Sequence, residues 1–290
     1  MIAVSFLARK QMIEDLKKAK QFLAQQHYLK ASELLEKQYQ LKKTFEINYW
    51  LTQAYCKLGQ ATKAYQLATE YLHEYVKEEK MLSFYVQVGL EAKQTLKMQQ
   101  LIVALKDQLS VQQVDFLQNE IATKPADANY QAFLKKFNHL GAFELFEQRL
   151  LVQEMYQLTP KDFIASAKKL LIDVDVHQLI KAQLFEELLK LQVTDEINYV
   201  NLWSEQQTIK LAHLVFLEDT KIYAYYQKKL MDINLIEQAQ LAQELYLKLM
   251  LLYPDFSRVD DFESWYDILL NRTPSKTASL LEEQLKMWEI

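Results

Sequence analysis

The stretch that decides the fold is Leu51-Thr-Gln-Ala-Tyr55-Cys-Lys-Leu-Gly59-Gln-Ala-Thr-Lys-Ala64-Tyr-Gln-Leu67. Leu51 and Tyr55 are four residues apart, so their large side chains lie on one face of a helix. Gly59 can adopt the left-handed conformation that ends that helix. Ala64 is small where a second helix has to cross the first closely. The stretch therefore predicts two helices joined by a short turn.

The same pattern recurs along the first third of the chain. At a shift of 33 residues, Phe22 aligns with Tyr55, Gln26 with Gly59, Ala31 with Ala64 and Leu34 with Leu67. A third copy is fainter: Leu51 and Tyr55 align with Phe84 and Val88 at 33, and Leu67, Ala68 and Tyr71 align with Leu101, Ile102 and Leu105 at 34. We expect the one-residue change to fall in the turn between the two helices. Repetition at this period indicates stacked helix pairs.

This pattern resembles the tetratricopeptide repeat, most closely over residues 44–76, where Ala54 and Tyr55 precede the turn. Residues 12–42 match more loosely, and residues 78–108 match faintly. The early tryptophan and the closing proline of the consensus are missing from all three copies. The resemblance implies a curved array in which the first helix of each pair lines a concave groove.

Helical periodicity continues to the end of the chain. Thr159 with Pro160, and Pro125 with Asp127, are typical helix starts. The expected fold is all-α, a tetratricopeptide-like α-solenoid of about seven helix pairs, with residues 1–140 and 141–290 as two domains. The later helices are expected at 110–123, 127–140, 142–158, 160–172, 175–192, 217–230, 234–252, 259–271 and 275–289.

One segment breaks the helical pattern. Ile197, Tyr199, Asn201 and Trp203 alternate with polar neighbours, and a polar turn follows at 204–206. Alternation of aromatic and β-branched residues predicts a small β-hairpin near residues 196–211, even though the usual turn glycine is missing.

The surrounding region is similar to a second group of proteins. A His-x2-Ile-Lys motif, His177 to Lys181, precedes the hairpin, and Leu251 to Pro254 follows it. In these features, residues 140–255 resemble a Firmicutes family of tetratricopeptide-repeat proteins of unassigned function. The resemblance implies a cytoplasmic location and no known activity.

Composition excludes several classes of function. Only three of the 290 residues are glycine, which argues against phosphate-binding loops and α/β enzyme folds. The net charge is −4 and the basic residues are mostly lysine, so we expect no nucleic-acid partner. The single cysteine, the lack of a long apolar run and the lack of a signal peptide predict a cytoplasmic protein without a membrane partner.

The sequence predicts no catalytic, cofactor-binding or metal-binding residues. Asp173, Asp175 and His177 form the one compact set of possible metal ligands, which leaves a metal-dependent hydrolase as a minor alternative. We interpret Asp173 or Asp175 as the cap of a helix that begins near residue 176. Cys56 is interpreted as a small core residue.

The remaining function is binding. Groove-facing candidates, by the repeat alignment, are Lys17, Lys20, Tyr49, Trp50, Gln53 and Lys57. Aromatic anchors with an amide and lysines suit an extended peptide or a helix, although Tyr49 and Trp50 could equally pack between repeats. The lysine–asparagine clamp that holds C-terminal carboxylates is absent, because Tyr49 and Gln53 occupy its positions.

The expected function is a non-catalytic scaffold that docks a protein or peptide in the groove. A peptide-responsive regulator that acts through a partner protein is the alternative. A DNA-reading domain is not expected, because the dozen residues before the first repeat are too few to form one.

Overall fold

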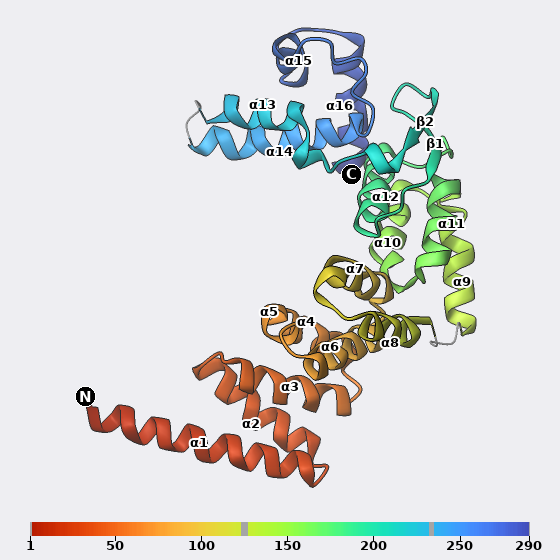
Figure 1. The fold of residues 1–290 in the computed structure, drawn as a ribbon. Coiled ribbons are helices and arrows are strands. Elements are labelled where there is room, and N and C mark those ends of the chain that lie inside the picture. Colours follow the sequence, from red (N-terminus) through yellow and green to blue (C-terminus); the bar gives the residue numbers. More distant parts are fainter. Residues whose placement is uncertain (1, 123–126, 232–234, 290) are drawn as a thin grey trace. The chain divides into compact units, whose positions relative to one another are not determined.

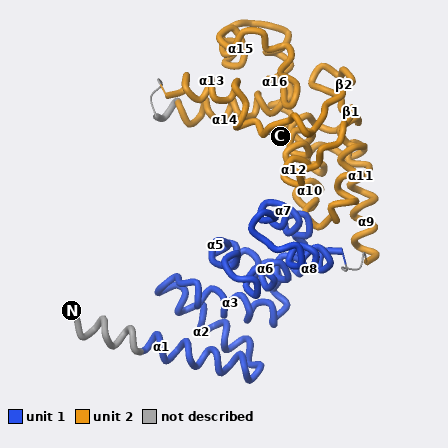
Figure 2. Tube along the Cα trace, in the orientation of Figure 1, with its two compact units in different colours: residues 1–124 blue, residues 125–290 orange. Residues whose placement is uncertain are grey.

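The structure is a computed structural model that describes residues 2–122, 127–231 and 235–289 (Figure 1). The expected fold class is confirmed: the chain is 72% helix, its helices contact their neighbours in sequence, and one β-hairpin interrupts them. The chain divides into two compact units, residues 1–124 and residues 125–290 (Figure 2). The expected domain boundary after residue 140 stays a prediction. No helix in the described part of the chain is long and apolar enough to span a bilayer.

The first unit is a series of antiparallel helix pairs in which each helix packs against the next. Contacts also join α4 to α6 and α6 to α8, so the pairs stack on one another. Its described helices are α1 (Ile2–Ala24), α2 (Tyr28–Leu41), α3 (Phe45–Lys57), α4 (Ala61–Thr69), the single turn α5 (Leu72–Tyr75), α6 (Glu79–Glu91), α7 (Thr95–Leu105) and α8 (Val111–Ala122).

Three of the turns between paired helices have the same backbone structure. Gln26, Gly59 and Lys93 all have positive φ, at 61°, 70° and 58°. In each turn the next N–H donates back to a carbonyl five residues earlier, as Gln60 N does to Tyr55 O at 2.9 Å. This arrangement satisfies the carbonyls that the end of a helix leaves without partners. The predicted role of Gly59 is therefore confirmed.

The predicted alignment of the third helix pair is wrong by one residue. Helices α3 and α6 each contain 13 residues, and they begin 34 residues apart. The turns at Gly59 and Lys93 are also 34 apart. Tyr55 therefore aligns with Gly89 instead of Val88. The one-residue change lies before α6, where α5 joins successive pairs, and not in the turn within a pair.

The core of the first unit is built from the small and large residues that the pattern predicted. Ala31 and Ala64 have no exposed surface, and Leu51 and Tyr55 are buried in the same region. The buried Asn48 side chain donates to Leu67 O at 2.7 Å and accepts from the Tyr75 hydroxyl at 3.0 Å. These bonds join α3 to α4 and α5, and they satisfy polar groups that would be costly to bury alone.

The second unit combines further helices with the hairpin, whose prediction is confirmed. Strand β1 (Glu196–Val200) pairs antiparallel with β2 (Gln206–Lys210), with Ile197 opposite Ile209. The described helices are α9 (Ala128–Phe137), α10 (Leu145–Gln153), α11 (Pro160–Leu170), α12 (Gln178–Lys190), α13 (Lys221–Leu230), α14 (Leu235–Leu252), α15 (Phe262–Leu269) and α16 (Lys276–Glu289).

Two predicted helix starts are present in this unit. Thr159 caps α11, and Pro160 is in its first turn. Asp127 caps α9 by accepting from Tyr130 N at 2.8 Å, whereas Pro125 lies outside the described residues.

The hairpin turn forms without glycine because a side chain organises it. The carboxamide oxygen of the buried Asn201 accepts from the backbone N–H groups of Trp203 and Glu205, both at 3.0 Å. Ser204 adopts the left-handed conformation, with φ of 60°. A polar side chain that bonds to nearby backbone in this way stabilises a turn that glycine would otherwise supply.

The helix that follows the acidic pair begins later than predicted, and neither aspartate caps it. Helix α12 begins at Gln178, so the capping position falls on His177, whose Nδ1 accepts from Leu179 N at 3.2 Å. Asp173 instead accepts from Asp175 N within the preceding loop, at 3.0 Å. The assignment of Asp173 or Asp175 as the cap is therefore wrong.

The His-x2-Ile-Lys motif joins α12 to the hairpin and to the last helix. The Lys181 ammonium donates to Val200 O at 3.3 Å, and the Gln178 amide donates to Asn201 O at 3.1 Å. On its other side, His177 Nε2 lies 3.2 Å from Gln284 O of α16. The motif that carries the second resemblance thus has a structural role in this unit.

Candidate functional site

The candidate site lies along the first helices of the pairs in the first unit. A pocket of about 300 Å³ lies between α3 and α6, and a second of about 520 Å³ lies between α6 and α8. Phe84 and Gln87 line both, so the two pockets adjoin. The α3–α6 pocket is lined by Gln53, Cys56, Lys57, Phe84, Gln87, Val88 and Glu91. The α6–α8 pocket is lined by Glu79, Lys80, Ser83, Phe84, Gln87, Phe116 and Glu120.

Aromatic rings run across the three helices beside these pockets. The Trp50 and Tyr49 rings are 5.2 Å apart, and the Tyr49 and Phe84 rings are 5.3 Å apart. Phe116 lies across the α6–α8 pocket from Phe84, and 53% of its surface is exposed. We call Trp50, Tyr49, Phe84 and Phe116 the aromatic strip. A ring that is only half-buried offers apolar surface to a partner.

One end of the aromatic strip already holds a cation from the chain itself. The Lys20 ammonium of α1 lies 5.0 Å from the centre of the Trp50 ring and 2.6 Å from the Glu46 carboxylate. Glu46 and Trp50 are one turn apart on α3, so they present a carboxylate and an aromatic ring on one face. The two groups together orient the lysine side chain.

Two glutamine amides occupy equivalent positions in neighbouring helix pairs. Gln53 on α3 and Gln87 on α6 are 34 residues apart, and both line the α3–α6 pocket. The Gln87 side chain makes a long 3.4 Å bond to Glu91, and the Gln53 side chain makes no hydrogen bond to the described residues. An amide side chain has donors and an acceptor, which matches the donor and acceptor of a peptide group.

The predicted groove residues have three different surroundings. Gln53 and Lys57 line the α3–α6 pocket, and Lys20 and Trp50 contact each other beside it. Lys17 is exposed on α1. Tyr49 packs more deeply, because its ring also lies 6.4 Å from Phe45 and 6.5 Å from Tyr75.

Phe84, Gln87 and Phe116 are among the pocket residues that the predicted groove did not include, and a signal for the first two was present in the sequence. Phe84 and Gln87 are equivalent to Trp50 and Gln53 at the correct shift of 34, which the alignment at 33 concealed. Phe116 lies on α8, beyond the three copies in which the repeat pattern is recognisable.

The thiol of Cys56 lines the α3–α6 pocket but is poorly suited to nucleophilic chemistry. Burial raises its pKa to about 12, and the nearby carboxylate of Glu91 acts in the same direction. A thiol with so high a pKa stays protonated near neutral pH, and the thiolate is the reactive form.

The possible metal ligands of the second unit do not converge on a common point. Both nitrogens of His177 face other groups, Leu179 N and Gln284 O, and its ring stacks on Trp288 at 5.1 Å. Across the described residues, no three His, Cys, Asp or Glu side chains are grouped closely enough to hold a metal ion.

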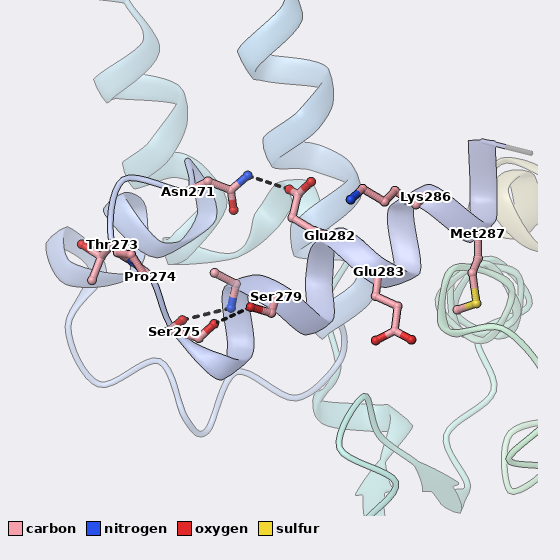
Figure 3. Close-up of a pocket in the computed structure, with 10 residues that line it drawn as sticks. Asn271, Thr273, Pro274, Ser275, Ser279, Glu282, Glu283, Lys286 and Met287 are labelled. Atoms are coloured by element: carbon pink, nitrogen blue, oxygen red, sulfur yellow. Dashed lines mark hydrogen bonds between the residues drawn. The ribbon is translucent and has the colours of Figure 1, made fainter.

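A further surface hollow of about 560 Å³ lies along α16 and the loop before it (Figure 3). Its polar groups largely bond to one another: Asn271 donates to Glu282 at 2.7 Å, and Ser279 donates to Ser275 O at 3.2 Å. Glu282 also pairs with the buried Lys248. The hollow therefore offers fewer unsatisfied groups to a ligand than the pockets of the first unit.

No protein-family model matches the chain, and neither a curated protein nor a solved structure is significantly similar to it. The protein is therefore classified by its architecture alone, as a largely helical protein of stacked antiparallel helix pairs.

Proposed function

We propose that the protein is a non-catalytic scaffold of the tetratricopeptide type, which binds a segment of a partner protein along α3, α6 and α8. The repeating turn at Gln26, Gly59 and Lys93 and the period of 33 to 34 residues support the repeat type. Stacking of such pairs brings equivalent positions of the first helices side by side, which is the arrangement that repeat proteins use for extended ligands.

The observation that carries the proposal is the pairing of Gln53 with Gln87 beside the aromatic strip. Amides that recur along adjacent helices can bond to successive peptide groups of an extended segment, whatever its sequence. Half-buried rings supply the apolar contact that gives such binding its affinity. The combination favours a flexible protein segment over a small metabolite, because the two pockets adjoin along neighbouring helices.

The experiment that tests this function is a selection of random peptides displayed on phage against the purified protein. The peptides that bind are then measured against Gln53→Ala/Gln87→Ala. Because this variant lacks two hydrogen-bonding amides, its affinity for the peptides is expected to be lower by a factor of about ten or more. Trp50→Ala is a poorer test, because Trp50 packs against the core cluster of Leu35 and Tyr55 and its loss would also lower stability.

The matched control is Gln40→Ala/Gln66→Ala. These two glutamines are exposed on the second helices α2 and α4, away from the pockets. The proposal predicts peptides whose binding survives the control and is lost in the pocket variant. Peptides that bind both variants equally well, or no peptides at all, would show that these helices are not the docking site.

A further inference from the structure

The α6–α8 pocket contains aromatic rings and carboxylates, and on α3 the same kinds of group bind a cation of the chain itself. There, the Trp50 ring and the Glu46 carboxylate one turn away hold the ammonium of Lys20. An aromatic face and a carboxylate together attract a cation more strongly than either does alone.

The same pairing of rings with carboxylates lines the α6–α8 pocket. Phe116 and Glu120 are one turn apart on α8, and Phe84 and Glu79 face them from α6. Among the described residues that line this pocket, Glu79 and Glu120 are acidic and Lys80 is basic. No lysine or arginine of the described residues is stacked on either phenylalanine ring. The pocket therefore has groups that bind a cation, and more than half of the surface of Phe116 is exposed to a partner.

We propose that this pocket binds an arginine side chain of the docked segment. The planar guanidinium would stack on Phe116 and face the carboxylate of Glu79. Arginine suits this pocket better than lysine, because its guanidinium stacks on rings and binds carboxylates through two donors. Among the described lining residues, the adjoining α3–α6 pocket has one lysine and one glutamate, whereas Glu79 and the Phe116 ring both line the α6–α8 pocket, so we assign the basic residue of the segment to the α6–α8 pocket.

This inference rests on the proposed docking function and adds the chemistry of the partner. The test uses the peptides selected on the wild-type protein and dependent on Gln53 and Gln87. Each arginine in them is replaced by citrulline, which keeps the shape of the side chain and removes its charge. Affinities are measured by fluorescence anisotropy against the wild type, Glu79→Gln and Phe116→Ala, at low and high salt.

Citrulline at one position is expected to weaken binding to the wild type about five- to thirtyfold. The same replacement should have a much smaller effect on Glu79→Gln and Phe116→Ala, because the group that recognises the charge is gone. Lysine at that position should bind with intermediate affinity. The exposure of Phe116 makes its truncation compatible with folding, and circular dichroism checks this directly. Glu33→Gln, an exposed carboxylate on α2, serves as the control.

Three results would overturn the inference. Selected peptides that need Gln53 and Gln87 but no cationic residue would remove the arginine pocket and leave the docking function intact. The same conclusion would follow if citrulline weakened binding equally to the wild type and to both pocket variants. If no selected peptide depended on Gln53 and Gln87, the docking function itself would be wrong, and the inference would fail with it.

Discussion

A Cβ atom added at Gly89 would lie 2.8 Å from both Cγ and Cε of Met98, and closer still to its sulfur. The two residues are fitted to each other across α6 and α7. In the preceding helix pair, Tyr55 and Ala64 occupy the equivalent positions, 34 residues earlier. The large residue is therefore on the first helix in one pair (Tyr55) and on the second helix in the next (Met98), with a small residue opposite it each time. The helices pack closely in both pairs.

This exchange predicts energetic coupling between Gly89 and Met98. Gly89→Ala is expected to lower the free energy of unfolding by about 1 kcal/mol, because overpacking outweighs the gain in helix propensity. Met98→Ala should cost about 2–5 kcal/mol through the cavity it leaves. In the double variant the new methyl group partly fills that cavity, so the combined loss should be at least 1 kcal/mol smaller than the sum. Urea unfolding of the four proteins measures this, and additive losses would contradict it.

The turn after α6 offers a stabilising substitution. Lys93 is exposed and has φ of 58°, a conformation that costs an ordinary residue energy and glycine little. Lys93→Gly is therefore expected to raise the free energy of unfolding by up to about 1 kcal/mol, and Gly59→Ala to lower it by a similar amount. Thermal unfolding followed by circular dichroism checks both. A loss of stability in Lys93→Gly would contradict this account of the turn.

The sequence predicted the helix pairs because their determinants are local. Four-residue spacing of Leu51 and Tyr55, a glycine that ends the helix and a small Ala64 are visible in a single stretch of the chain. Alternation from Ile197 to Trp203 revealed the hairpin in the same way. The hairpin forms although its turn has no glycine, because the Asn201 side chain stabilises the turn.

Features that depend on contacts between distant residues were not visible. The register of the third pair was misplaced because the positions of Tyr55 and Ala64 are occupied there by Gly89 and Met98. A small residue stands where the pattern has a large one, and a large residue where it has a small one, so the pattern is not recognisable. The cap of α12 was assigned to aspartate, a common capping residue, whereas the helix begins at Gln178 and His177 is its cap. Phe116 could not be placed in a site without knowing how α8 packs on α6.

The stability of the second unit should fall in mild acid because of His177. Burial lowers the pKa of this imidazole to about 4, from 6.5 in an unfolded chain. As the pH falls below 6.5, the unfolded state takes up a proton that the folded state does not, so stability is lost between about pH 6.5 and pH 4. His177→Asn keeps a capping acceptor and cannot titrate. The wild type should therefore lose about 2 kcal/mol more than this variant between about pH 7.5 and pH 5 in urea unfolding. Equal losses would contradict the burial argument.

Lys181, one turn further along α12, should have its effect in the alkaline range. Burial lowers the pKa of its ammonium from 10.5 to about 8, and Asp173 and Asp175 offset this only in part. Above pH 8 the folded state releases a proton that the unfolded state retains up to about pH 10.5, so stability rises with pH in that window. Relative to Lys181→Met, the wild type should gain about 2 kcal/mol between about pH 7 and pH 9.5. A difference that does not change with pH would show that the ammonium is not desolvated.

The central claim, that partners dock along the first helices of the first unit, is tested most directly by site-specific photo-crosslinking. Gln53→p-benzoylphenylalanine places a photoreactive group in the α3–α6 pocket, and Gln66→p-benzoylphenylalanine places it on the exposed side of α4. Both proteins are irradiated in cells that produce the protein natively, and adducts are identified by mass spectrometry. The account predicts a discrete protein adduct at position 53, mapped to one segment of the partner and absent at position 66. Adducts of equal yield and identity at both positions, or adducts at position 66 alone, would contradict it.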